Sequence, residues 1–145
     1  MTKNLKEARA LQLINVLFFI VAAVLGSLSI ILPPYISPGK KVVFYDAPLF
    51  PIIATAIKNL SIFPTTLLLL IAGFIVGYLK SDIWWLLGFA TVILFPIAAI
   101  SEMILYPTTH NLWPLELLVY GILSIPPIIG ALLGSKLKKR MAQKS

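Results

Sequence analysis

The chain has 145 residues, of which 59% are hydrophobic and 12% are charged, and its formal net charge is +7. An ordinary soluble domain has roughly a quarter of its residues charged, so this composition excludes a water-soluble globule, and its high hydrophobicity excludes a disordered chain. The absence of cysteine excludes disulfides, thiol redox chemistry and thiolate metal sites. We therefore expect a single membrane domain over residues 1–145.

Four apolar stretches are long enough to cross a hydrocarbon core, which takes about 20 helical residues. In chain order they cover residues 11–32, 62–79, 83–105 and 115–135. Their apolar runs are continuous rather than alternating, which excludes a membrane β-barrel. The sequence thus predicts an all-α integral membrane protein with four transmembrane helices, the first of which ends at Pro33-Pro34. That first apolar run is longer than the core of a cleaved signal peptide, so we expect it to be retained.

The segment between the first two spans, residues 33–61, is the predicted outer loop. Within it, residues 49–60 place Thr55, Lys58 and Asn59 on one helical face and apolar residues on much of the rest. This pattern is typical of a short helix that lies in the membrane interface. A re-entrant segment is the alternative.

Two glycine motifs of the form G-x-x-x-G occur in the second and fourth spans, at Gly73 and Gly77 and at Gly130 and Gly134. In the predicted topology these spans run parallel and the motifs lie at matching depth near the inner boundary. Such motifs let membrane helices approach closely. The sequence favours packing within one chain, with a homo-oligomer or another membrane protein as the alternative partner.

Prolines interrupt the last two spans near mid-depth, at Pro96 and at Pro126 and Pro127. Because proline lacks an N–H donor and clashes with the carbonyl four residues back, helix kinks are expected there. Thr91 and Ser124 are close enough in sequence to bond the freed carbonyls. Broken helices at mid-depth form substrate sites in many transporters, but a proline in a membrane helix often only bends it, and we favour this structural role.

Lysine and arginine are unevenly distributed between the two sides of this topology. Nine lie in the terminal tails and in the loop between the second and third spans, whereas three lie in the outer loop. The positive-inside rule then predicts that both termini are cytoplasmic. In the basic tail, residues 136–145, each cation near the membrane gains about 1 kcal/mol from anionic lipid. We expect a plasma (inner) membrane protein whose partner is the lipid bilayer and not nucleic acid.

Four polar side chains are expected near the outer interface, and they are candidate catalytic or metal-binding residues: Asp46, Glu102, His110 and Glu116. Histidine suits both roles because it titrates near neutral pH and ligates metals. Their spacing matches no established ligand motif, and Asn111 followed by Glu116 is also typical of a helix start. The sequence favours a structural role for this set, and we expect no metal and no cofactor.

The chain has no phosphate-binding loop, no nucleophile elbow and no second histidine. This absence favours a non-enzymatic, accessory or scaffold-like membrane protein that acts through helix–helix contacts. One alternative is a small transporter or channel subunit that uses the kinked helices and Glu102. A second is a membrane enzyme or metal site at Glu102, His110 and Glu116.

Overall fold

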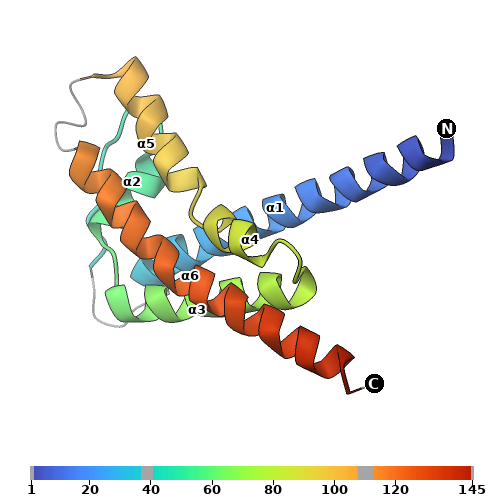
Figure 1. The fold of residues 1–145 in the computed structure, drawn as a ribbon. Helices are drawn as coiled ribbons and strands as arrows, with labels where there is room; N and C mark the ends of the chain where they lie inside the picture. The colour runs from blue at the N-terminus through green and yellow to red at the C-terminus, as the bar shows by residue number, and fades with distance from the viewer. Residues whose placement is uncertain (1, 37–40, 108–112, 145) are drawn as a thin grey trace.

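The structure is a computed structural model that describes residues 2–36, 41–107 and 113–144 (Figure 1). Within this part of the chain it contains six helices and no strands, which confirms the prediction of an all-α fold. In chain order the helices are α1 (Thr2–Ile36), α2 (Pro51–Lys58), α3 (Ile62–Leu79), α4 (Trp84–Ala90), α5 (Leu94–Leu105) and α6 (Trp113–Ala142).

Several of these helices are long and apolar enough to cross a membrane. α1 meets this condition over Arg9–Ile36, α3 over its whole length and α6 over Pro114–Ala142. α4 and α5 meet it only as a pair, and they are bent by 47° at the break between them. The described part of the chain thus has three such helices, or four if the bent pair is one span. Apolar helices able to span a membrane are confirmed, and the third predicted span, residues 83–105, consists of two helices with a break between them.

The break between α4 and α5 lies one turn before Pro96. Proline has no N–H to donate to the carbonyl four residues back, which is that of Val92. The Phe95 N–H bonds the Val92 carbonyl instead, at 3.1 Å, which makes a tighter turn. Nearby, the Thr91 hydroxyl donates to the Gly88 carbonyl at 2.7 Å. The N–H that Pro96 lacks would have bonded a carbonyl four residues earlier, so the helix is interrupted before Pro96 rather than at it.

The other prolines of the spans lie inside continuous helices. The sequence predicts that the first span ends at residue 32, but α1 runs through Pro33 and Pro34 to Ile36. α6 likewise runs as one helix through Pro126 and Pro127, and it continues beyond the predicted boundary at residue 135. Proline has a φ angle compatible with a helix and removes only one donor, so a helix that packs on either side of it can continue.

The chain ends and the connections gather at two ends of the bundle. Both termini and the turn between α3 and α4 lie at one end, on the right of Figure 1, which we call the termini end. α2, the end of α5 and the start of α6 lie at the opposite end. We call residues 41–50, which lead into α2, the strap, and this opposite end the strap end.

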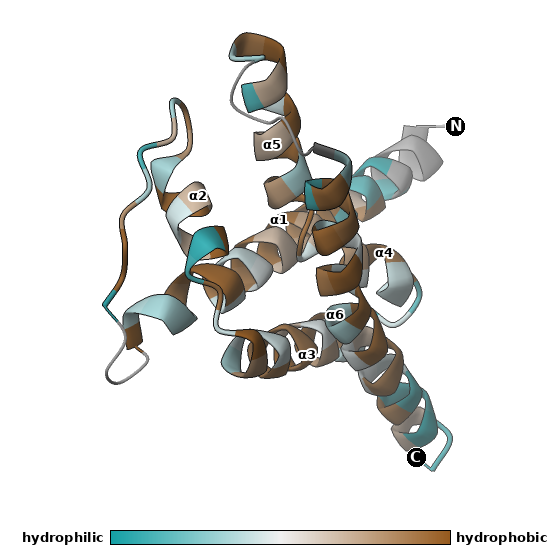
Figure 2. Ribbon diagram, turned by 90° about the vertical axis from the view of Figure 1, so that its left-hand side faces the viewer, coloured by the Kyte–Doolittle hydropathy of each residue, from teal (hydrophilic) through white to brown (hydrophobic). Residues whose placement is uncertain are grey.

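Buried apolar side chains form one cluster towards each end. The cluster at the strap end joins α1, α2, α3, α5 and α6, and it consists of Ile30, Ala56, Leu69, Val92, Phe95, Ala99, Tyr120 and Leu123. The second cluster joins α1, α3 and α4 through Ala22, Val76, Leu87 and Ala90. Hydrophobic residues colour most of the helical ribbon in Figure 2, and hydrophilic residues gather at the C-terminal end of α6. Many large apolar side chains of these helices are exposed, which suits a lipid environment.

Candidate functional site

The strap is fastened to α2 by two polar side chains of that helix and its cap. The Asn59 side chain accepts a hydrogen bond from the Val43 N–H at 3.1 Å and donates to the Val43 carbonyl at 2.8 Å. The Thr55 hydroxyl accepts from the Tyr45 N–H at 3.0 Å. Thr55 and Asn59 are on the polar face that the sequence predicts for this helix. In the structure this face bonds to the strap.

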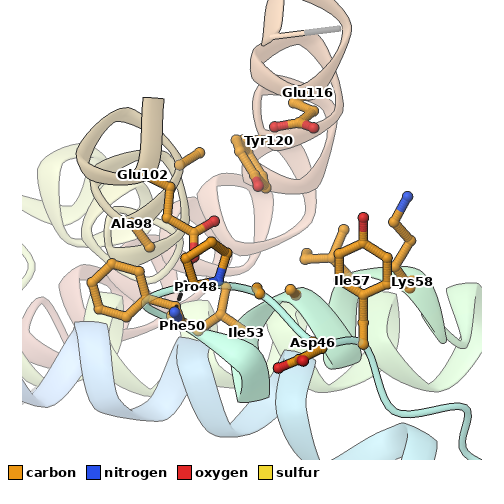
Figure 3. A pocket seen from close by; sticks show the side chains of 14 residues that line it. Asp46, Pro48, Phe50, Ile53, Ile57, Lys58, Ala98, Glu102, Glu116 and Tyr120 are labelled. Atoms are coloured by element: carbon orange, nitrogen blue, oxygen red, sulfur yellow. Dashed lines mark hydrogen bonds between the residues drawn. The ribbon is translucent and has the colours of Figure 1, made fainter. Parts of the chain in front are cut away.

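Glu102 holds the other end of the strap. Its Oε1 accepts a hydrogen bond from the Leu49 N–H at 3.1 Å. The same oxygen accepts a second bond from the Phe50 N–H at 2.9 Å (Figure 3). Glu102 belongs to α5 and is only 5% exposed. A buried carboxylate in an apolar setting needs partners, and charge-assisted bonds to two backbone amides supply them. Because Leu49 and Phe50 precede Pro51, these bonds also fix the start of α2 to α5.

A cavity of about 380 Å³ lies between the strap, α2, α5 and α6. Eight of its lining residues are apolar, and the other six carry polar or charged side chains: Tyr45, Asp46, Lys58, Glu102, Glu116 and Tyr120. Figure 3 shows Glu102, Tyr120 and Glu116 on the two helices at the top of the view, Lys58 at the right and Asp46 on the strap at the bottom. Small-molecule sites have about this size and composition, with volumes of about 300–1,000 Å³ and few polar groups.

Aromatic rings hold two of these polar groups in place. The Lys58 Nζ lies 5.0 Å from the centroid of the Tyr45 ring, an arrangement in which the ring face attracts the cation. The Tyr120 ring packs against Phe95, with centroids 6.3 Å apart and the ring planes tilted by 39°. Tyr120 therefore belongs to the buried cluster at the strap end as well as to the cavity wall.

The structure brings together three of the four candidate residues that the sequence indicates. Asp46, Glu102 and Glu116 all line the cavity, although the Asp46 carboxylate points away from Glu116 in Figure 3. His110 lies outside the described residues, as does Asn111. Within residues 2–36, 41–107 and 113–144, no group of three or more His, Asp or Glu side chains is placed to hold a metal ion.

Sequence reasoning did not identify Tyr45, Lys58 and Tyr120 as residues of this site. For Tyr120 a signal exists, because it follows Glu116 by four residues and so shares its helix face. For Lys58 the polar face of residues 49–60 is visible in the sequence, but its direction is not. Nothing in the sequence indicates that Tyr45 meets Lys58, since the strap has no periodic pattern.

The four glycines of the two G-x-x-x-G motifs lie in the contact between α3 and α6. A Cβ atom at Gly73 would overlap the carbonyl oxygen of Pro127, and one at Gly77 would overlap that of Ala131. In the same way, Gly130 and Gly134 lie against the carbonyl oxygens of Leu70 and Phe74. Contact positions increase together along both helices, so α3 and α6 run parallel here. These glycines face each other inside one chain.

Polar bonds also tie the end of α6 to the turn after α3. The Ser135 hydroxyl donates to the Ser81 carbonyl at 3.1 Å, and the Lys138 ammonium donates to the Leu79 carbonyl at 2.7 Å. In the turn itself, Lys80 and Asp82 form an ion pair at 2.7 Å. The hydrogen bond from the Lys80 side chain lowers the pKa of Asp82 below its ordinary value of 3.8. The termini end is thus closed by direct contacts.

Chemically, the cavity can hold a small polar molecule between groups of opposite charge. Two carboxylates attached to neighbouring helices face it, together with a tyrosine hydroxyl and an ammonium group. The remaining wall is apolar and excludes water from the part of a ligand that carries no charge. Comparison of the chain with models of known protein families, with curated proteins and with solved structures gives no match.

Proposed function

We propose that the protein binds a small polar solute in the cavity beneath the strap, as the solute-binding part of a small transporter or channel subunit. The observation that carries this proposal is the cavity of about 380 Å³ whose wall contains the buried carboxylate of Glu102. A carboxylate within an apolar helix is a functional candidate by default because of its cost in lipid. Glu102 belongs to α5, the second half of the broken span, and discontinuous helices are typical of transporter substrate sites.

In this proposal the chain crosses the plasma membrane four times, with the bent pair α4 and α5 as one span. The excess of lysine and arginine at the termini end supports cytoplasmic termini, which places the strap and the cavity on the outer side. α2 buries Thr55 and Ala56 and exposes Ile52, which supports an interfacial helix that packs on the bundle rather than a re-entrant one. The lipid bilayer is then the surrounding partner, with no part for nucleic acid.

The proposal is tested by the thermal stability of the purified protein in mild detergent, measured with a panel of amino acids, alkylamines and carboxylic acids at millimolar concentration. A bound solute stabilises the folded state, so at least one member of the panel should raise the melting temperature. Ala54→Leu, which adds bulk to the cavity wall, should abolish this shift. Ala10→Leu, at an exposed position on α1, is the matched control and should keep it.

Two results would contradict solute binding. One is a panel in which no compound raises the melting temperature of the wild-type protein. The other is an equal rise in the melting temperature of the Ala54→Leu variant, because filling the cavity would not affect a ligand that binds elsewhere. In either case transport or channel activity at this site would lose its basis.

A second candidate function is that of an accessory or scaffold-like protein that acts through helix–helix contacts, within a homo-oligomer or with another membrane protein. The specific observation in its favour is α1, whose residues 9–14 are exposed on every side of the helix. In Figure 1 the N-terminal part of α1 projects beyond the other helices. The motif glycines of α3 and α6 contact each other, so a partner would meet α1 instead.

This second candidate is tested by affinity capture of the tagged protein from its native membranes, followed by mass spectrometry and a native gel. A stoichiometric partner or a homo-oligomer should be lost when Leu13→Trp enlarges an exposed residue of α1. Leu118→Trp, at a similarly exposed position on α6, is the control and should keep it. If both variants retain the partner or the homo-oligomer to the same extent, α1 is not the contact surface.

A further inference from the structure

One side of α6 is a continuous stripe of exposed apolar residues. Its members are spaced three or four apart and so share one face of the helix: Leu118, Ile122, Ile125, Ile129 and Leu133. Pro127 and Ala131 lie on the opposite face, where they contact glycines of α3. When α6 crosses a membrane, this apolar stripe is the surface that meets the acyl chains of the lipid.

Two cations continue the apolar stripe towards the termini end. Lys136 follows Leu133 by three residues and Arg140 follows Lys136 by four, so both lie on the same face of α6 as the stripe. Both residues are exposed. Within the part of the chain that the structure describes, neither side chain forms an ion pair or a hydrogen bond. The face that meets acyl chains therefore ends in two positive charges that no acid of the described chain neutralises.

A contact with the turn after α3 fixes the depth of these two cations. The Ser135 hydroxyl donates to the Ser81 carbonyl at 3.1 Å, so Lys136 lies level with this polar turn, at which the apolar helix α3 has ended. The end of α6 continues past the turn in Figure 1. Arg140 lies about 6 Å farther out along the helix, within a headgroup region of about 5–8 Å in each leaflet. Both side chains are thus at the depth of lipid phosphates.

The neighbouring cations of α6 are placed differently. Lys138 donates to the Leu79 carbonyl at 2.7 Å. Lys139 precedes Arg140 by one residue and so lies about 100° around the helix from it. Lys136 and Arg140 are like charges one turn apart, which repel each other, and an anion between them removes the repulsion. A phosphate fits this place, because arginine offers it two parallel N–H donors and lysine a compact charge.

We propose that Lys136 and Arg140 bind the phosphate of an acidic phospholipid, whose acyl chains lie along the apolar stripe at Ile129 and Leu133. The lipid is acidic because the ammonium group of a zwitterionic headgroup would add a positive charge beside the two that are present. A general attraction of the basic tail to anionic lipid would involve all its cations, whereas this site consists of two. It is separate from the cavity at the strap end and does not depend on a solute bound there.

Three probes test the site on the full-length protein in mild detergent. They are phosphatidylglycerol, phosphatidylcholine with the same short acyl chains, and glycerol 3-phosphate, which has a phosphate but no chains. The rise of the melting temperature with lipid concentration gives each dissociation constant. Phosphatidylglycerol should bind roughly tenfold more tightly than phosphatidylcholine, because two cations favour the acidic headgroup. Glycerol 3-phosphate should bind more weakly than phosphatidylglycerol, because it makes no contact with the stripe.

Variants assign the binding to the two cations. Lys136→Gln and Arg140→Gln should each weaken phosphatidylglycerol about fivefold, which is the affinity that one cation at the membrane surface gains from anionic lipid. Binding of phosphatidylcholine should not change. Lys144→Gln is the matched control, because it removes the same charge at an exposed position beyond the end of α6 at Ala142. All three residues are exposed, so the melting temperature of each variant without lipid should equal that of the wild-type protein.

Three results would overturn the lipid site. Equal binding of phosphatidylcholine and phosphatidylglycerol would exclude a preference for acidic lipid. If Lys144→Gln weakens phosphatidylglycerol as much as Lys136→Gln does, the tail attracts acidic lipid as a whole and has no site. Glycerol 3-phosphate that binds as tightly as phosphatidylglycerol would make free phosphate, rather than a lipid, the ligand. None of these results bears on the response of Ala54→Leu to solutes, so the lipid site and the solute cavity are tested separately.

Discussion

Near the termini end, the backbones of α3 and α6 touch with no side chain between them, whereas at the strap end α2, α5 and α6 stand apart around a cavity. The first contact depends on glycines whose added Cβ atoms would overlap carbonyl oxygens of the partner helix. The second depends on hydrogen bonds between the backbone of the strap and the side chains of Glu102 and Thr55, which accept from its N–H groups, and of Asn59, which donates to a carbonyl. Both arrangements hold helices together where the hydrophobic effect does not, because lipid is as apolar as the helix surfaces.

The difference between the two ends has consequences for motion and function. Contact between backbones leaves no space and tolerates no added atom, so the α3–α6 contact acts as a fixed frame. Hydrogen bonds to a strap leave a cavity of about 380 Å³ and break one at a time. The strap itself contributes no side chain to either buried apolar cluster. Segments held by few buried apolar contacts open more readily than packed cores, and binding sites are drawn from them. We therefore expect the strap to change on binding and the contact between α3 and α6 to stay as it is.

The largest effect is expected from a methyl group added in the contact between α3 and α6. Gly130→Ala should destabilise the bundle by about 2–3 kcal/mol, since its Cβ would overlap the carbonyl oxygen of Leu70 and separate the helices. Gly121→Ala is the matched control on the same helix, because a Cβ there meets no atom within 4 Å. Unfolding by SDS in mixed micelles, followed by circular dichroism, measures the difference. Equal stability of the two variants would mean that the glycine contact is not needed.

At the strap end, removal of the buried carboxylate should act locally. Glu102→Ala leaves the amides of Leu49 and Phe50 without their acceptor and should cost about 2 kcal/mol, the usual worth of hydrogen bonds to a charged group. Hydrogen exchange of these two amides should become roughly thirtyfold faster, while exchange in α3 should not change. Glu102→Gln keeps one acceptor oxygen and should have a smaller effect. Unchanged exchange in the strap would show that Glu102 does not hold it.

The smallest effect is expected at the surface of the termini end, in the ion pair of Lys80 and Asp82. The lowered pKa of Asp82 means that this pair contributes stability above the unfolded value and loses it as the pH falls below about 4. The Asp82 side chain is 64% exposed, so the contribution should be below about 0.5 kcal/mol and should weaken with salt. Acid titration of the melting temperature, with Asp82→Asn as the comparison, measures it. If the melting temperature of Asp82→Asn falls in acid by as much as that of the wild-type protein, groups other than Asp82 cause the loss.

Parts of the fold were predictable because the signal is local. The apolar stretches of α1, α3 and α6 are long and continuous, and in lipid such a stretch must satisfy its backbone bonds within a helix. The interruption of the third apolar stretch was visible at Pro96, but its position was not, because a missing donor acts on the carbonyl one turn back. The need of Glu102 for a partner was also visible, since a carboxylate within an apolar helix requires one.

By itself, the sequence determined which segments are apolar helices, which positions allow close approach and which charge needs a partner, because each of these depends on residues within a few turns of one helix. Only the tertiary structure decided that Gly73 and Gly130 belong to one contact, and that Glu102 bonds to amides more than fifty residues earlier in the chain. Every residue except proline has the same backbone N–H, so nothing in the sequence marks Leu49 and Phe50 as its partners. The cavity follows from that pairing, because the strap that Glu102 holds forms one of its walls.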